Sequence, residues 1–208
     1  MLTFCMLLLV PPLLSAGILS STILDVLFSL VVLSAAAAAS TDPRAAYAAA
    51  SLAIVTLAIR WLHLGLTEPA LGIVDAALGA GVLLIFAALV LRQVFRSGPI
   101  TLHRVRGAVA AFLLLGISWA DAYELVWRIS PDAFKLGDAK DPRLELTYYS
   151  FVTLTTVGYG DITPLIPAAR SLAIAEALIG QLFPAVLIAR LVSMEIADRL
   201  SARDHRVN

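Results

Sequence analysis

The sequence has few of the residues from which catalytic and metal-binding sites are built. Cys5 is the only cysteine among 208 residues, which excludes a disulfide within the chain and a thiolate metal site. The three histidines, His63, His103 and His205, lie far apart and do not have the spacing of metal ligands. We therefore expect neither a metal enzyme nor a cofactor.

Charge is also scarce. Charged residues make up 14% of the chain, compared with about 25% in ordinary soluble domains. Lys and Arg number 15, as do Asp and Glu, so the net charge is zero and no nucleic-acid partner is expected. Hydrophobic residues reach 60%, and the mean hydropathy is +0.91. This composition predicts a multi-pass, all-α membrane protein in contact with lipid.

The apolar residues gather into six stretches, each about as long as a helix that crosses a bilayer, which needs roughly 20 residues. The predicted spans are residues 2–19, 22–39, 45–62, 70–91, 105–126 and 166–192. The first is interpreted as a retained helix kinked at Pro11 and Pro12, because no basic residue precedes it; a secretory signal is the alternative. The fourth has no arginine ladder, so conventional voltage sensing is not predicted and the gating stimulus stays unassigned.

The arginines predict an orientation. They gather in the loop between the fourth and fifth spans and in the segment after the sixth, and Arg44 lies between the second and third. With six crossings, all these segments fall on one side of the membrane, the cytoplasmic side by the positive-inside rule. We therefore expect both termini in the cytoplasm of a cell (inner) membrane, and the loop of residues 130–143 outside.

One short motif has the residues expected of an ion-binding segment. Its six residues are Thr156, Val157, Gly158, Tyr159, Gly160 and Asp161. A potassium ion that leaves water needs rings of backbone carbonyls, and these point to one axis when right- and left-handed backbone conformations alternate. Gly158 and Gly160 take a positive φ without steric cost, while Thr156 offers a hydroxyl as well as its carbonyl. Since one strand gives one oxygen per ring, the motif predicts a homotetramer, with three identical partner subunits.

The segments on either side of this motif are suited to hold it as an ion-selectivity filter. Residues 144–155 are too short to cross the membrane and predict a re-entrant pore helix, whose C-terminal dipole favours a cation. The sixth span would then line the pore. Gly180 and Pro184 within it are sites where the helix can bend.

Residues 105–192 resemble the pore module of the potassium channel superfamily, and the layout resembles that of small bacterial six-helix channels with one pore loop. The resemblance implies that Thr156, Val157, Gly158 and Tyr159 coordinate K⁺ through their carbonyls, supported by the other filter-flanking residues. Those supporting residues are Tyr149, Thr155, Gly160 and Asp161. It also implies that Gly180 is a gating hinge, with Pro184 one turn later, and that Tyr149 replaces a tryptophan that hydrogen-bonds the filter aspartate, Asp161. Val152 departs from a glutamate that some members place behind the filter.

Three acidic residues lie in or near the predicted spans. Glu176 comes four residues before Gly180, and two interpretations stay open: a charge that concentrates cations near the cavity, or a group hydrogen-bonded behind the filter towards the pore helix. For Asp25 and Asp75, a helix-end or inter-helix hydrogen bond is favoured over an ion path.

The sequence therefore divides into residues 1–104, holding four helices, a pore module of residues 105–192, and a short cytoplasmic tail of residues 193–208. The predicted function is passive, potassium-selective transport across the plasma membrane. A less selective cation channel and a non-conducting membrane subunit are the alternatives. An enzyme is not predicted, since no nucleophile–base pair appears in the spans.

Overall fold

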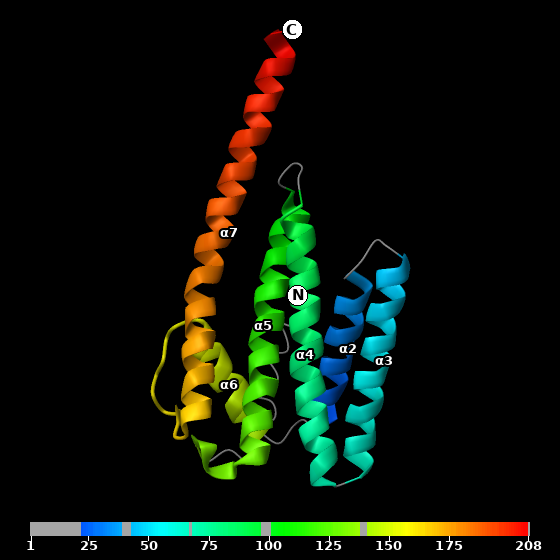
Figure 1. Ribbon diagram of the computed structural model, residues 1–208, viewed down its shortest axis with the longest axis vertical. Coiled ribbons are helices and arrows are strands. Elements are labelled where there is room, and N and C mark those ends of the chain that lie inside the picture. Colours follow the sequence, from blue (N-terminus) through cyan, green and yellow to red (C-terminus); the bar gives the residue numbers. More distant parts are fainter. Residues whose placement is uncertain (1–21, 39–42, 67, 97–100, 138–140, 208) are drawn as a thin grey trace.

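A computed structural model describes residues 22–38, 43–66, 68–96, 101–137 and 141–207 (Figure 1). Six helices account for most of them: α2 (Thr22–Ala38), α3 (Pro43–Gly65), α4 (Pro69–Val94), α5 (Leu102–Ile129), α6 (Pro142–Leu154) and α7 (Pro167–Val207). A short 3₁₀ turn, η1 (Pro131–Ala133), and two short strands, β1 (Phe134–Lys135) and β2 (Thr163–Pro164), complete the chain order. The predicted span at residues 2–19 lies outside the described residues.

Proline starts several of these helices. α4 and α6 have Pro69 and Pro142 in their first turn, where the missing backbone N–H costs no hydrogen bond. In α6 the preceding Asp141 caps the helix, because its carboxylate accepts a hydrogen bond from the backbone N–H of Arg143 at 3.0 Å. The start of the short helix is therefore specified by adjacent residues.

Four of the described helices are long and apolar enough to cross a membrane. The spans are Ala46–Gly65, Pro69–Val94, Leu102–Ile129 and Pro167–Met194, and Thr22–Ala37 is a shorter apolar helix. The all-α membrane architecture is therefore confirmed, whereas the count of six spans stays a prediction. With 13 residues, α6 is only about 20 Å long, shorter than the roughly 30 Å apolar layer of a bilayer.

The helices form one packed row. α4 and α5 lie side by side, α2 and α3 pack against α4, and α6 and α7 pack against α5 (Figure 1). A core between α2, α3, α4 and α5 contains Phe28, Val32, Ala53, Leu83 and Leu115. A second core of Tyr123, Phe134, Leu146, Tyr149 and Ile162 holds α6 against α5 and the segment after it. These two cores connect the N-terminal helices to the predicted pore module.

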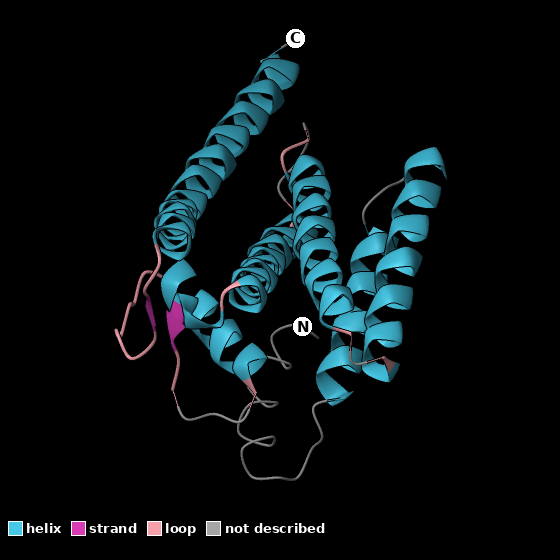
Figure 2. Cartoon of the chain, turned by 60° about the horizontal axis from the view of Figure 1, so that its bottom comes forward, coloured by secondary structure: helices cyan, strands magenta, loops and turns pink. Residues whose placement is uncertain are grey.

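The two short strands close the pore module. β1 and β2 are antiparallel, with Phe134 opposite Pro164 and Lys135 opposite Thr163. Figure 2 shows them beside the loop that follows α6. The pairing ties the segment after α5 to the segment after the predicted filter.

α7 is one helix of 41 residues. It continues past the predicted end of the sixth span at residue 192 and through most of the predicted tail, with Pro184 inside it. In the single chain, one long side of α7 exposes apolar side chains: Ile174, Leu178, Leu182, Val186, Ile188 and Val192. These are the positions that a bilayer or further chains would have to cover.

Candidate functional site

The backbone of the predicted filter alternates in handedness. Thr156, Gly158 and Gly160 have φ values of +60°, +57° and +79°, with residues of ordinary φ between them. The positive φ predicted for the two glycines is confirmed. Thr156 was not expected to share it, because a left-handed conformation strains a β-branched residue by about 1–3 kcal/mol. The alternation therefore extends over the five residues 156–160, and it includes one left-handed residue besides the two glycines.

The predicted filter is held at its start by the end of α6. The backbone carbonyl of Val152 accepts from the N–H groups of Val157 at 3.0 Å and Gly158 at 3.3 Å, and the carbonyl of Thr153 accepts from Thr156 at 2.9 Å. The Thr155 hydroxyl donates to the carbonyl of Phe151 at 2.6 Å. Although Val152 has no carboxylate to place behind the filter, its main chain anchors the first filter residues.

The filter side chains have little cover from their own chain. Val157 is 52% exposed and Tyr159 is 71% exposed. The described residues of this chain therefore leave both side chains largely uncovered.

The filter aspartate is bonded by Tyr148, and the prediction of Tyr149 as its partner is wrong. The Tyr148 hydroxyl donates to Asp161 Oδ2 at 2.7 Å. This hydrogen bond lowers the pKa of Asp161 below its usual range and raises the pKa of Tyr148 to about 12. The two residues therefore connect the exposed side of α6 to the end of the filter.

Tyr149 faces the opposite way, into the protein. It is 7% exposed, and its ring packs edge-on against Tyr123 and Phe134, at centroid distances of 4.9 and 5.7 Å. Adjacent helical residues point about 100° apart, so one step along α6 decides which tyrosine reaches Asp161. Tyr149 therefore packs α6 against α5 and β1.

Glu176 lies behind α6 and not on an exposed surface. It is 0% exposed, and its carboxyl group contacts the hydroxyls of Tyr123 and Ser150 at 2.5 and 2.6 Å. The first belongs to α5 and the second to α6. Of the two interpretations left open by the sequence, this geometry favours the group hydrogen-bonded towards the pore helix.

Gly180 has a role that its prediction as a hinge did not include. A Cβ at this position would lie 1.9 Å from the carbonyl oxygen of Leu154, the last residue of α6. Glycine therefore lets α7 approach the end of the pore helix, immediately before the filter. The proposed bending at Gly180 and Pro184 stays a prediction, since α7 is continuous through both.

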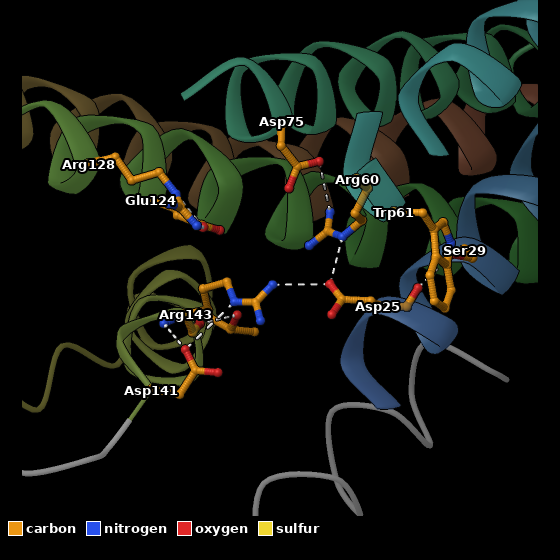
Figure 3. Close-up of polar contacts among 10 residues, drawn as sticks. Asp25, Ser29, Arg60, Trp61, Asp75, Glu124, Arg128, Asp141 and Arg143 are labelled. Atoms are coloured by element: carbon orange, nitrogen blue, oxygen red, sulfur yellow. Dashed lines mark hydrogen bonds and ion pairs between the residues drawn. The ribbon is translucent and has the colours of Figure 1, made fainter. Parts of the chain in front are cut away.

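A buried ion network joins the N-terminal helices to the start of α6 (Figure 3). Asp25 Oδ1 accepts from Arg60 Nε at 2.9 Å and from Arg143 Nη1 at 3.1 Å. Arg60 Nη1 lies 4.0 Å from Asp75 Oδ1, and the Arg60 guanidinium stacks 3.7 Å above the ring of Phe28. The inter-helix role expected for Asp25 is confirmed, and it extends to the pore helix.

Sequence reasoning missed the basic half of this network and the partners of Glu176. Arg60 is 6% exposed, and its position inside an apolar stretch was a signal of buried pairing. Arg143, Ser150 and Tyr123 gave no comparable signal, since their types are ordinary where they stand. Only the packing of the helices against one another brings them to their partners.

Part of the chain is similar to known proteins. Residues 109–196 match the family model described as ion channel. The chain is 38% identical to Two pore potassium channel c of Oryza sativa subsp. japonica over 78 residues, covering 32% of this chain and 17% of that protein. It is 56% identical to Protein LctB of Bacillus caldotenax and 53% identical to Protein LctB of Geobacillus stearothermophilus, each over 45 residues, 22% of this chain and 33% of the relative. The chain thus spans a third or less of these relatives, and no solved structure matches it.

Proposed function

Because residues 109–196 match the family model described as ion channel, and part of the chain is similar to a two pore potassium channel, we propose that the chain is one subunit of a tetrameric, potassium-selective channel. The family match supports an ion channel, and not an enzyme, as the function of this multi-pass membrane protein. Potassium selectivity, the tetramer and the membrane it occupies are the parts that the proposal adds.

The alternating backbone of the filter carries the proposal. With positive φ at Thr156, Gly158 and Gly160, the handedness of the backbone changes from each residue to the next, as a strand of inward-facing carbonyls requires. The carbonyls of Thr156, Val157, Gly158 and Tyr159 are the proposed K⁺ ligands. Only oxygen ligands are needed, and the permeating ion is the cargo and not a resident cofactor.

The number of subunits follows from one filter strand per chain. One strand gives one oxygen to each ring, so four identical chains complete the coordination of the ion. The exposure of Val157, Tyr159 and the apolar side of α7 supports this assembly, because neighbouring chains would bury those surfaces.

The arrangement of the helices supports the expected orientation. The C-terminal end of α4, the N-terminal end of α5 and the C-terminal end of α7 lie towards one end of the molecule (Figure 1). These ends hold most of the loop and tail arginines, so we propose that this end faces the cytoplasm. The filter then opens on the outer side of the cell membrane, and the C-terminal dipole of α6 points at the ion path.

Ion flux into liposomes tests the proposal. Purified protein, reconstituted in liposomes with matched K⁺ or Na⁺ gradients, is expected to pass K⁺ far faster than Na⁺. Equal rates would support a less selective cation channel, and no flux of either ion a non-conducting subunit.

A variant in the filter links the flux to the proposed site. Gly158→Ala forces a side chain into φ +57° and is expected to abolish the preference for K⁺ or all conduction. Because nothing lies within 4 Å of a Cβ at this position, loss of function would come from backbone strain and not from a clash within the chain. Normal selective flux through Gly158→Ala would show that this segment is not the filter.

A further inference from the structure

The carboxyl group of Glu176 sits where three helices meet, and the conduction proposal does not use it. Glu176 of α7, Ser150 of α6 and Tyr123 of α5 are each 0% exposed. Ser150 lies six residues before Thr156, the first proposed ligand of K⁺. Hydrogen bonds that fix the position of Ser150 therefore also fix the position of the C-terminal end of α6.

The hydrogen bonds at this point can be counted proton by proton. Ser150 Oγ lies 2.6 Å from Glu176 Oε1 and 2.7 Å from the carbonyl oxygen of Gly116, and Tyr123 Oη lies 2.5 Å from Glu176 Oε2. These are three close oxygen–oxygen contacts. A serine hydroxyl and a tyrosine hydroxyl supply one proton each, and the carbonyl of Gly116 supplies none. An ionised Glu176 would leave one contact with two facing lone pairs and no proton between them.

We propose that Glu176 carries a proton and, as a neutral acid, positions the pore helix. Its O–H donates to Ser150 Oγ, the Ser150 hydroxyl donates to the carbonyl of Gly116, and Tyr123 donates to the second carboxyl oxygen. Each close contact then contains one proton. The result is a continuous set of hydrogen bonds from α7 through α6 to α5.

The surroundings of the carboxyl group agree with a neutral acid. The titratable groups that face it are Tyr123 from α5 and, nearby, Tyr149 from α6. Within the described residues, Glu176 forms no ion pair with Lys or Arg. A carboxylate here would be a buried charge without a counter-ion, which is a costly state in a protein interior.

A neutral Glu176 has a consequence for conduction. It contributes no negative charge to the ion path, so its role would be to hold α6 in register with α7. Glutamine has nearly the same shape, donates to Ser150 through its amide N–H and accepts from Tyr123 through its oxygen. Glu176→Gln therefore keeps the three-helix connection, whereas Glu176→Ala leaves the buried Tyr123 hydroxyl without a partner.

Infrared difference spectroscopy of the full-length protein tests the proton directly. Wild type minus Glu176→Gln isolates the carboxyl group of residue 176, in one detergent and at neutral pH. The expected difference is the carbonyl stretch of a protonated carboxylic acid. In Ser150→Ala this band is expected at a higher frequency, because the acid proton loses its acceptor. A difference spectrum with only carboxylate bands would overturn the proposal.

Flux measurements test the positioning role, and this part depends on the proposed channel function. Glu176→Gln is expected to keep K⁺ flux within about threefold of wild type, a change below about 1 kcal/mol, while Glu176→Ala loses more. Folded Glu176→Gln protein with flux lost tenfold or more would overturn that role. If Glu176→Gln does not fold, the frequency shift between wild type and Ser150→Ala decides the protonation instead. If the wild type itself does not conduct, the spectra still decide the proton, so the two proposals fail separately.

Discussion

Replacing Gly180 by alanine tests whether this residue is needed for the close approach of α7 to α6 or serves only as a hinge. Alanine in the middle of a helix is more stable than glycine by about 1 kcal/mol, so helix propensity alone predicts a more stable protein. The added Cβ, however, would lie 1.9 Å from the Leu154 carbonyl oxygen, which belongs to backbone and cannot rotate away. α6 or α7 must shift by about 1 Å or more, and such overpacking costs about 1–3 kcal/mol or more.

The shift would act at the end of the pore helix, next to the filter. After the propensity gain, we expect Gly180→Ala to be less stable than wild type by up to about 2 kcal/mol, and to lose K⁺ flux on the order of tenfold. Stability is read from thermal unfolding in one detergent, and flux from liposomes. A pure hinge role predicts a different pair of results: altered flux with equal or greater stability.

Gly81 provides the matched control. It is an exposed glycine inside α4, and a Cβ there meets nothing within 4 Å. Gly81→Ala is expected to raise stability by about 0.5–1 kcal/mol and to leave flux unchanged. The close contact at Gly180 would be refuted if both variants gained stability to the same extent and conducted like wild type.

Two further substitutions probe the supports of the pore helix. Tyr148→Phe removes the hydrogen bond to Asp161, so the pKa of this carboxyl is expected to rise towards its ordinary value; ¹³C NMR of labelled aspartate would follow the titration, and an unchanged Asp161 would contradict the contact. Arg143→Gln removes one of two cations bonded to the buried Asp25 and is expected to lower stability by about 1–3 kcal/mol, as measured by thermal unfolding. The exposed Arg92→Gln is its control, and equal effects of the two would argue against a link between α2 and α6.

The long helices and the pore segment follow from local properties of the sequence. Runs of apolar residues specify both ends of α3, α4 and α5 to within a few residues, and the start of α7, which continues past its predicted end. The short α6 follows from its length and its position. The glycines at 158 and 160 predict the reversal of the backbone, because only glycine enters that region freely. The positive φ of Thr156 was not predicted, since no local sequence feature indicates that a β-branched residue adopts a strained conformation.

The supports of the filter could not be derived in this way, because they depend on how the helices face one another. Whether Tyr148 or Tyr149 reaches Asp161 depends on the rotation of α6, which is set by the packing of Tyr149 against Tyr123 and Phe134. A periodic sequence places residues on the faces of one helix but does not say which helix covers each face.

What the sequence determined by itself is the alternating backbone of the proposed filter segment and the helices around it, since both depend on residues close together in the chain. The tertiary structure decided what surrounds them: the contact of Gly180 with α6, the burial of Glu176, and the pairing of Asp25 with Arg60 and Arg143. These contacts join residues from 26 to 118 positions apart. These contacts form only when α2 to α7 pack together, because the packing brings residues of different helices within reach of one another.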